Sequence, residues 1–258
     1  MNPGILLIII TLAAGVAVYG LRRINIPRKA GFEGIEVPEI AEAYNRISRW
    51  PQFRVLRLMI ARQLACYAPS GILADIGCGP GYLATLIAQR HPQLEVLGLD
   101  ASDEMVKAAE SNASNLGLSD RVKFRRGDAA NLPLPDGTLD FAVSTLSLHH
   151  WSDPSRGLAE AHRVLKPGGQ LLLFDLRRDA RRFFLWLVHF AQGVVVPAAL
   201  RRANEPLGSL QSSYSLTEAQ ALLAESQFKE YAIDGRAAWV FVWARKASQE
   251  AAQLPVRG

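Results

Sequence analysis

A glycine-rich turn, LADIGCGPGYLA at residues 73–84, is the feature that most constrains the fold of this chain. A short apolar run, Ile72 to Ile76, leads into it, and residues 82–90 follow with the apolar spacing of a helix. The pattern therefore predicts a strand, a tight turn and a helix. Glycines carry no side chain, so a ligand can lie against the turn and the first amides of the helix. A turn that only caps a helix would look similar, because a glycine repeat alone is weak evidence.

Strand-like and helix-like segments alternate along the rest of the chain. The expected strands are residues 72–76, 94–99, 122–126, 139–144 and 170–175, with two closing strands within 229–235 and 237–246. Helices are expected within 38–64, broken at Pro51, and at 82–90, 102–116, 154–165 and 215–228. Such alternation is typical of an open, mostly parallel sheet with helices on both faces. The predicted fold class is therefore α/β.

The first three strands each end in an acidic residue or carry one into the following loop. These residues are Asp75, Asp100 and Asp128, and the last is followed by the small Ala129. An acid at the second strand end can accept both ribose hydroxyls of a nucleoside, NAD included. A carboxylate at the third could accept the amine of an adenine. Either acid alone is more often a solvated strand end or a helix cap, but two acids and a glycine turn in this order are far more specific.

The spacing of the glycines distinguishes between classes of nucleotide site. Gly77, Gly79 and Gly81 form G-x-G-x-G, and Tyr82 stands where a dinucleotide fingerprint would have its third glycine. The missing glycine and the acid at Asp128 both argue against a nucleotide-dependent oxidoreductase, which is the main alternative enzyme class.

Four segments, in this order and spacing, resemble the class I S-adenosylmethionine-dependent methyltransferases. They are LADIGCGPGYLA, VLGLDASDEMV, GDAANLPLPDGTLDFAVSTLSLHHWSDP and EAHRVLKPGG. The resemblance covers about Glu39 to Lys246 and is closest to the small-molecule branch that includes menaquinone- and ubiquinone-type enzymes. It implies an open, Rossmann-like sheet of about seven strands, the last of them reversed, and S-adenosyl-L-methionine as the cofactor.

The resemblance also implies which residues hold the cofactor. The methionine part would lie against Asp75 and the glycine turn, the ribose against Asp100, and the adenine against the residues after the second and third strands. The end of the fourth strand would lie beside the transferred methyl group, and a helix carrying Tyr44 would cover the site. The implied cofactor-binding residues are Tyr44, Asp75, Gly77, Cys78, Gly79, Gly81, Asp100, Ala101, Met105, Asp128, Ala129, Ser144 and Leu146. No metal site is expected.

Two histidines follow the fourth strand, near the expected position of the methyl group. Methyl transfer is an in-line displacement at a carbon already activated by its sulfonium, so the protein mainly aligns the acceptor and excludes water. A base is needed only if the acceptor is protonated at the working pH. His150 is the candidate for that role, and the alternative is that His149 and His150 pack and bond loop backbone.

The charge distribution argues against a nucleic-acid partner. Residues 1–62 hold nine Arg and Lys against four Glu, so the net charge of +5 lies there and the remaining residues balance to zero. A nucleic-acid enzyme would carry basic charge around its active face. The apolar content of 49% against 21% charged residues also excludes a disordered chain. Cys66 and Cys78 both lie in segments that look buried, which favours a reducing compartment.

The excess positive charge follows the most hydrophobic segment of the chain. Pro3 to Leu21 comprises nineteen residues without a charged side chain, a helix of about 28 Å. A cleaved signal peptide would carry positive residues before the apolar run, and a core helix rarely lacks a polar face over such a length. We therefore expect residues 1–24 to be a transmembrane anchor. Arg22 and Arg23 would place the linker 25–38, the domain 39–246 and the tail 247–258 in the cytoplasm.

A second apolar run, Phe183 to Leu200, lies within an insertion at residues 177–212. Gly193 and Pro197 interrupt it, both of its flanks are positive, and the closing strands after it must join the same sheet. It is therefore not expected to be a second span. Helices at the membrane surface, a cover over the acceptor pocket, or packing into the domain core are the alternatives.

The sequence thus predicts methyl transfer from S-adenosylmethionine to a small lipophilic acceptor at the cytoplasmic face of a membrane. A quinone precursor, a lipid, a phenol or a thiol would each qualify. A non-catalytic, cofactor-binding scaffold is the alternative outside the enzymes. A nucleic-acid methyltransferase is disfavoured, because STLS at residues 144–147 replaces an Asn/Asp-Pro-Pro-aromatic motif.

Overall fold

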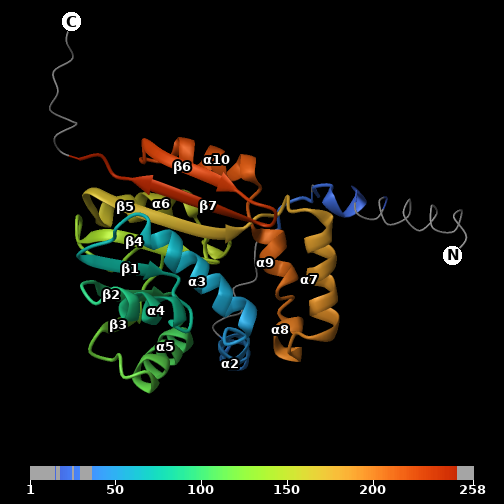
Figure 1. Ribbon diagram of the computed structural model, residues 1–258, viewed down its shortest axis with the longest axis horizontal. Helices are drawn as coiled ribbons and strands as arrows, with labels where there is room; N and C mark the ends of the chain where they lie inside the picture. The colour runs from blue at the N-terminus through green and yellow to red at the C-terminus, as the bar shows by residue number, and fades with distance from the viewer. Residues whose placement is uncertain (1–14, 16–17, 25, 30–36, 249–258) are drawn as a thin grey trace, which may run out of the picture.

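A single sheet of seven strands organises the molecule, in the order β3-β2-β1-β4-β5-β7-β6 (Figure 1). The computed structural model describes residues 15, 18–24, 26–29 and 37–248. Strand β7 runs antiparallel to both β5 and β6, and the other neighbours are parallel. The strands are β1 Ile72–Ile76, β2 Glu95–Asp100, β3 Val122–Arg126, β4 Leu139–Thr145, β5 Leu165–Leu176, β6 Glu230–Gly235 and β7 Trp239–Arg245. The predicted Rossmann-like sheet with a reversed last strand is confirmed.

Helices connect the strands and begin where the sequence provides a suitable first residue. They are α2 Pro38–Ile47, α3 Pro51–Ala65, α4 Tyr82–Arg90, α5 Asp103–Asn115, the 3₁₀ turn η2 Leu148–His150, α6 Pro154–Val164, α7 Arg182–Val194, α8 Ala198–Arg202, α9 Leu207–Ser212 and α10 Leu216–Glu225. Proline stands at the start of α2, α3 and α6, where its missing N–H costs nothing. Ser215 caps α10 through a reciprocal pair of bonds with Glu218.

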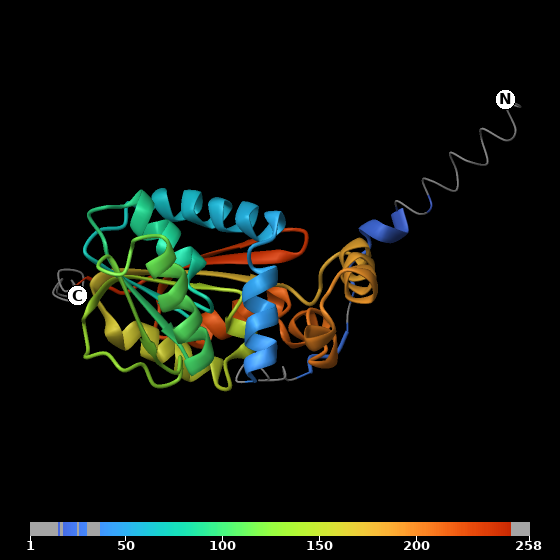
Figure 2. The same cartoon turned by 90° about the horizontal axis from the view of Figure 1, so that it is seen from below.

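The core lies on both faces of the sheet, because successive strand residues point to opposite sides. Leu171 and Leu173 of β5 pack in the cluster that contains α6 and α10 residues, whereas Leu172 between them packs in the cluster that contains α3 and α4 residues. Figure 2 shows the sheet between these helical layers. The arrangement leaves the carboxyl ends of β1, β2 and β4 free for a site.

Helices α7, α8 and α9, which we call the cap, occupy much of the insertion at 177–212 and stand beside α2 (Figure 1). Helix α8 packs against α2, and Val196, Ala199 and Leu200 form a small apolar cluster with Ala43 and Ile47 of α2. The apolar run from Phe183 breaks into two helices near Gly193 and Pro197, as expected. Helix α9 was not expected from the sequence.

Residues 22–24 and 26–29, which we call the strap, run along the cap. The amide of Ile24 donates to Ala180 O at 2.9 Å and that of Lys29 to Gln211 O at 3.1 Å. Arg28 donates to Ser212 O at 2.7 Å and lies over the Tyr214 ring, 4.3 Å from its centre. Arg178 in turn donates to Ile26 O at 2.6 Å. These contacts fix the strap to the same body as the sheet.

The expected membrane anchor, residues 1–24, lies mostly outside the described residues, as do most of the linker and the end of the tail. Residues 18–21 are helical and expose Val18, Tyr19 and Leu21. Within the part of the chain that the structure describes, no helix is long and apolar enough to cross a bilayer.

Candidate cofactor and acceptor site

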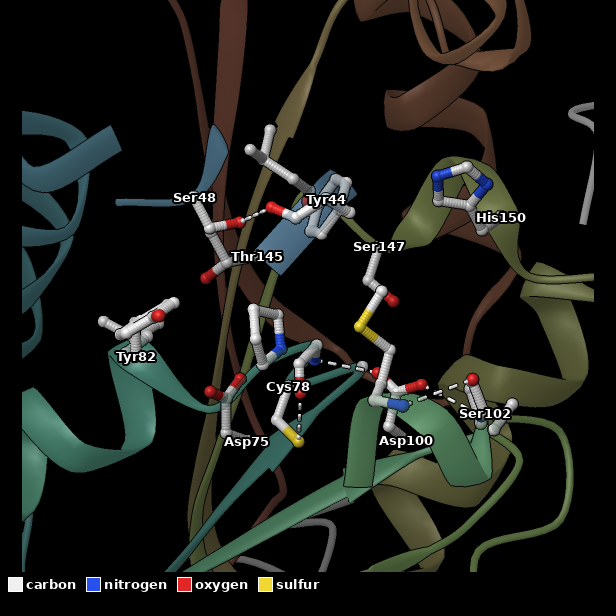
Figure 3. Close-up of a pocket in the computed structure, with 18 of the residues that line it drawn as sticks. Tyr44, Ser48, Asp75, Cys78, Tyr82, Asp100, Ser102, Thr145, Ser147 and His150 are labelled. Atoms are coloured by element: carbon white, nitrogen blue, oxygen red, sulfur yellow. Dashed lines mark hydrogen bonds between the residues drawn. The ribbon is translucent and has the colours of Figure 1, made fainter. Parts of the chain in front are cut away.

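A cavity of about 390 Å³ opens at the carboxyl ends of β1, β2 and β4. Ligands of open α/β sheets bind at this edge, where neighbouring strands connect in opposite directions. Its walls come from the glycine turn, the loops after β2, β3 and β4, and the helices α2 and α3. Figure 3 shows Asp75 and Asp100 at the strand ends, with Tyr44 and His150 on the other side of the cavity.

The glycine turn fits tightly between the cavity and the core. Gly77, Gly79 and Gly81 all have positive φ angles, of 74°, 51° and 75°, which favour glycine. A Cβ on Gly77 would lie 1.9 Å from Ser147 Oγ, so that position admits no side chain. Gly81 does not line the cavity, and its predicted contact with the cofactor stays a prediction. A Cβ there would lie 2.8 Å from both Ala109 Cβ and Phe124 Cζ, so its role is close packing.

Asp75 is a buried carboxylate that lacks a partner. It is 1% exposed, lines the cavity, and neither of its oxygens has a hydrogen-bond partner among the described residues. Burial, and then the nearby charge of Asp100, raise the pKa of Asp75 to about 7, and the backbone amide of Ala84 counteracts only part of this rise. A buried carboxylate is stable only when a cation or donor reaches it. The ammonium of an amino acid moiety would meet that need, so the site fits the methionine part of S-adenosylmethionine.

Asp100 is held at the end of β2 by two backbone amides. Gly79 N donates to one carboxylate oxygen at 2.8 Å, and Ser102 N donates to the other at 3.0 Å. Burial raises the pKa of Asp100, and these two amides counteract part of that rise. The turn and the strand end therefore orient this carboxylate toward the cavity, where its remaining acceptor positions suit a ribose diol.

The expected adenine contacts lie next to Asp100 on the same wall. Ala101, Met105, Asp128 and Ala129 all line the cavity. Asp128 is exposed and accepts a hydrogen bond from Ala130 N at 2.9 Å. This hydrogen bond stabilises the turn that follows β3. The contact of Asp128 with an adenine remains a prediction.

The end of β4 presents the predicted Leu146 to the cavity, together with Thr145 and Ser147, which the sequence did not single out. Ser144 is buried but does not line the cavity, whereas Thr145, Leu146 and Ser147 do. Side chains alternate between the faces of a strand, so a shift of one residue changes which hydroxyl reaches the site. Neither the Ser144 nor the Thr145 hydroxyl has a hydrogen-bond partner among the described residues, and Ser147 Oγ accepts from Trp151 Nε1 at 3.1 Å. The contact of Ser144 with the cofactor stays a prediction, and Thr145, which lines the cavity, is a further candidate.

His150 lines the cavity, and its Nδ1 has no hydrogen-bond partner among the described residues. Burial, and then the charge of His149, lower the pKa of His150 to about 3. The ring is therefore neutral at physiological pH, and it can accept a hydrogen bond from an acceptor hydroxyl. A group with so low a pKa holds a proton poorly, so this geometry favours orientation over strong general-base catalysis.

His149 does not line the cavity and instead fixes the η2 turn. Its Nδ1 lies 2.6 Å from Asp175 Oδ1, and its backbone amide donates to Asp175 Oδ2 at 2.9 Å. Burial would lower the pKa of His149, but the charge and hydrogen bond of Asp175 raise it overall. For His149, the alternative of a packing residue that bonds its surroundings agrees with the structure.

Helices α2 and α3 cover the cavity and contribute the expected Tyr44 and, in addition, Arg57, which the sequence did not single out. Tyr44, expected to contact the cofactor, lines the wall, and burial followed by nearby acids raises its pKa to about 12. Arg57 of α3 also lines it, donates to Ser48 O at 2.8 Å, and lies over the ring of Tyr82 at 5.0 Å. The positive charge of Arg57 on the cavity wall suits the carboxylate of a bound amino acid moiety.

A polar network ties α2 to the glycine turn. Asn45 Oδ1 accepts from Tyr82 Oη at 2.9 Å and from Asn112 Nδ2 at 3.1 Å, and Asn112 also donates to Pro80 O at 2.9 Å. Arg49 donates to Tyr82 Oη at 2.7 Å. The cover over the cavity is thus fastened to the turn that would hold the cofactor.

The two cysteines differ. Cys78 is buried in the glycine turn and lines the cavity, and burial raises the pKa of its thiol. Cys66 is exposed, contrary to the expectation that both are buried, because it follows the last turn of α3 at the surface.

Comparison with known families agrees with this geometry. Residues 74–173 match the family described as methyltransferase domain. A S-adenosylmethionine-dependent methyltransferase from Aquifex aeolicus has the same fold, with a TM-score of 0.56 and 21% identity over 81% of this chain and 97% of that one. Residues 74–173 therefore resemble the class of methyltransferase domains, and the chain has the fold of an S-adenosylmethionine-dependent methyltransferase.

Within that class, the homologues include quinone-type enzymes. A demethylmenaquinone methyltransferase from Deinococcus radiodurans is 33% identical over 54% of this chain and 57% of its own length. A ubiquinone/menaquinone biosynthesis C-methyltransferase from Geotalea daltonii is 28% identical over 64% of this chain and 65% of its own length. The chain thus spans less than two thirds of either relative.

Proposed function

We propose that the protein transfers a methyl group from S-adenosylmethionine to a small lipophilic acceptor. The observation that carries this proposal is the unpartnered, buried carboxylate of Asp75 beside the glycine turn, with Asp100 held next to it. When bound, the cofactor supplies a methyl group on a positively charged sulfur. The two carboxylates then bind its amino and ribose groups, and Arg57 suits its carboxylate.

The remaining wall of the cavity is suited to an apolar acceptor with a polar group. Phe53, Leu56, Leu146 and Trp151 line it together with the neutral ring of His150. The apolar side chains exclude water, and His150 orients an acceptor hydroxyl without needing to take its proton. The quinone-type enzymes among the relatives support an aromatic ring acceptor.

The test is to identify the labelled product. The full-length protein is incubated with S-adenosylmethionine carrying a labelled methyl group and an extract of membrane lipids, and labelled compounds are identified by mass spectrometry. We expect label in a lipophilic ring compound, and none with Asp100→Ala. Cofactor binding without label in any fraction would favour the scaffold alternative, and label only in water-soluble compounds would contradict the lipophilic acceptor.

We further propose that residues 1–24 anchor the protein in a membrane, with the domain on the cytoplasmic side. The support is the uncharged stretch from Pro3 to Leu21 and the arginines that follow it. Alkaline extraction should leave the full-length protein in the membrane fraction, and external protease should not reach the domain in intact cells. A mature protein that starts after Ala17 and is secreted would contradict the anchor.

A further inference from the structure

One face of α7 is apolar, aromatic and exposed. The helix has no buried residue. Phe183, Trp186, Leu187, Phe190 and Val194 are between 41% and 68% exposed. Trp186 stacks on both Phe183 and Phe190, with ring centres 6.1 and 5.7 Å apart. Soluble surfaces rarely gather so many large apolar side chains, and such a patch marks a binding surface.

This face belongs neither to the domain core nor to the wall of the cavity. No α7 residue lines the cavity, and α7 reaches the apolar cluster beside α2 only through Ala191. Of the three alternatives that the sequence left for this segment, two therefore do not account for the exposed face. The third, contact with a membrane surface, does.

The face is continuous with the end of the apolar N-terminal segment. Arg23 and Arg181 form a β-bridge, and Arg182 N donates to Arg22 O at 2.9 Å. The Arg182 guanidinium lies over the Tyr19 ring, 4.5 Å from its centre. Exposed Val18 and Tyr19 thus stand next to the start of α7, and the chain that leads into them is apolar from Pro3 onward.

Arginines border the face at both ends. Arg22, Arg23, Arg181 and Arg182 cluster at its beginning, and Arg201 of α8 donates to Gly193 O at 3.3 Å at its end. Arg202 instead pairs with Glu39 of α2. Positive side chains next to an anionic lipid surface are attracted to its headgroups. Aromatic side chains prefer the same depth, between lipid tails and water. The chemistry of the border therefore matches phospholipid headgroups.

We propose that the exposed face of α7 is a docking surface for an anionic phospholipid bilayer and lies in the membrane interface beside the N-terminal anchor. The inference rests on the proposed membrane location but not on the methyl-transfer chemistry. Through Ala191 and α8, the docked helix packs on α2, which carries Tyr44 of the cavity wall. Helices α7, α8 and α2 then lie between the bilayer and the cavity.

The test measures hydrogen exchange of the full-length protein in nanodiscs. In discs that contain anionic phospholipid, the amides of α7 should exchange at least tenfold more slowly than in zwitterionic discs. Helix α5, with the same thirteen residues in length, is the internal control and should not change. The double variant Trp186→Gln, Phe190→Gln should lose the slowing, whereas Leu116→Gln, which alters an exposed leucine elsewhere, should retain it.

The outcomes separate the proposals. The docking surface would be overturned if α7 exchanged equally fast in anionic and zwitterionic discs. It would also be overturned if the double variant kept the slowing seen in the wild type. Slowing of α7 exchange that depends on protein concentration rather than on lipid would assign the face to contact with a second copy of the chain. That result would also overturn the lipid docking surface. Calorimetry of cofactor binding checks that each variant folds. Absent methyl transfer with intact lipid-dependent slowing would reject the proposed reaction and leave the docking surface standing.

Discussion

The strand ends and the cap depart from the usual distribution of polar and apolar groups in opposite ways. At the strand ends the protein buries charge, since Asp75 is 1% exposed and lacks a partner. On α7 it exposes apolar rings, since Trp186 is 60% exposed. Each arrangement is unfavourable in water alone, and each would be relieved by a different partner, the cofactor's ammonium at Asp75 and, as proposed, lipid at α7. Such locally costly features indicate where a protein binds something.

The largest effect is expected at the strand ends, where a single substitution removes the buried charge. Asp75→Asn removes a buried carboxylate that has no hydrogen-bond partner within the described residues, so cofactor affinity at pH 7.5 should fall about a hundredfold, or roughly 3 kcal/mol. The same change should stabilise the cofactor-free protein. Calorimetry and thermal unfolding measure both quantities. The cap variant Phe190→Gln should alter neither, and a loss of affinity there would mean that the two regions are coupled.

The pH dependence of the wild type provides the control for this interpretation. Because the pKa of Asp75 in the folded protein is about 7, above the ordinary value of 3.8, the folded state binds this proton more tightly. Stability from this group is full below about pH 4 and is lost as pH rises to 7, on the order of 2–4 kcal/mol. Cofactor affinity should fall up to tenfold per unit below pH 7. Asp75→Asn should abolish both trends, and their persistence would assign them to another group.

A pair of glycines sharpens the comparison. Gly81→Ala forces a Cβ into Ala109 and Phe124 at a positive φ and should destabilise the protein by about 1–3 kcal/mol. Gly193→Ala lies in α7, with no atom within 4 Å of the added Cβ, and should be neutral or stabilise by up to about 1 kcal/mol. Denaturant unfolding measures both. Equal effects would show that the cap is as tightly packed as the turn.

The smallest effect is expected at Asp128. Asp128→Ala should weaken cofactor binding by less than tenfold, because this carboxylate is exposed and already accepts from Ala130 N. Asp100→Ala should cost more, since Asp100 is clamped by two amides inside the cavity. Titration of both variants with the cofactor decides the order. A larger loss at Asp128 would reverse the assignment of the two acids.

Local patterns account for the parts of the fold that the sequence predicted. β1, β3 and α4 have the expected bounds, because apolar periodicity and the glycine turn act over a few residues. β5 is longer than expected and begins at Leu165, where it pairs with Leu139 of β4. Pairing of that kind joins distant parts of the chain. Helix α9 and the strap also depend on such long-range contacts, so no local signal announced them.

The site divides in the same way. Asp75, Gly77 and Asp100 were predicted, because they belong to a turn and strand ends that carry a motif. Thr145 was missed by one residue, and in a strand one residue changes the face. Arg57 lines the cavity because of where α3 lies over it. No motif around Arg57 in the sequence indicates that position.

The strap has a consequence for the speed of the reaction. A flexible linker would let the domain sample a hemisphere around its anchor, and only a fraction of its orientations would be productive. The hydrogen bonds at Ile24, Ile26, Arg28 and Lys29 leave no such slack between Arg22 and the cap. If residues 1–24 anchor the protein as proposed, lateral diffusion would replace this rotational search, and encounters with an acceptor would scale with its density per membrane area rather than with its concentration in water.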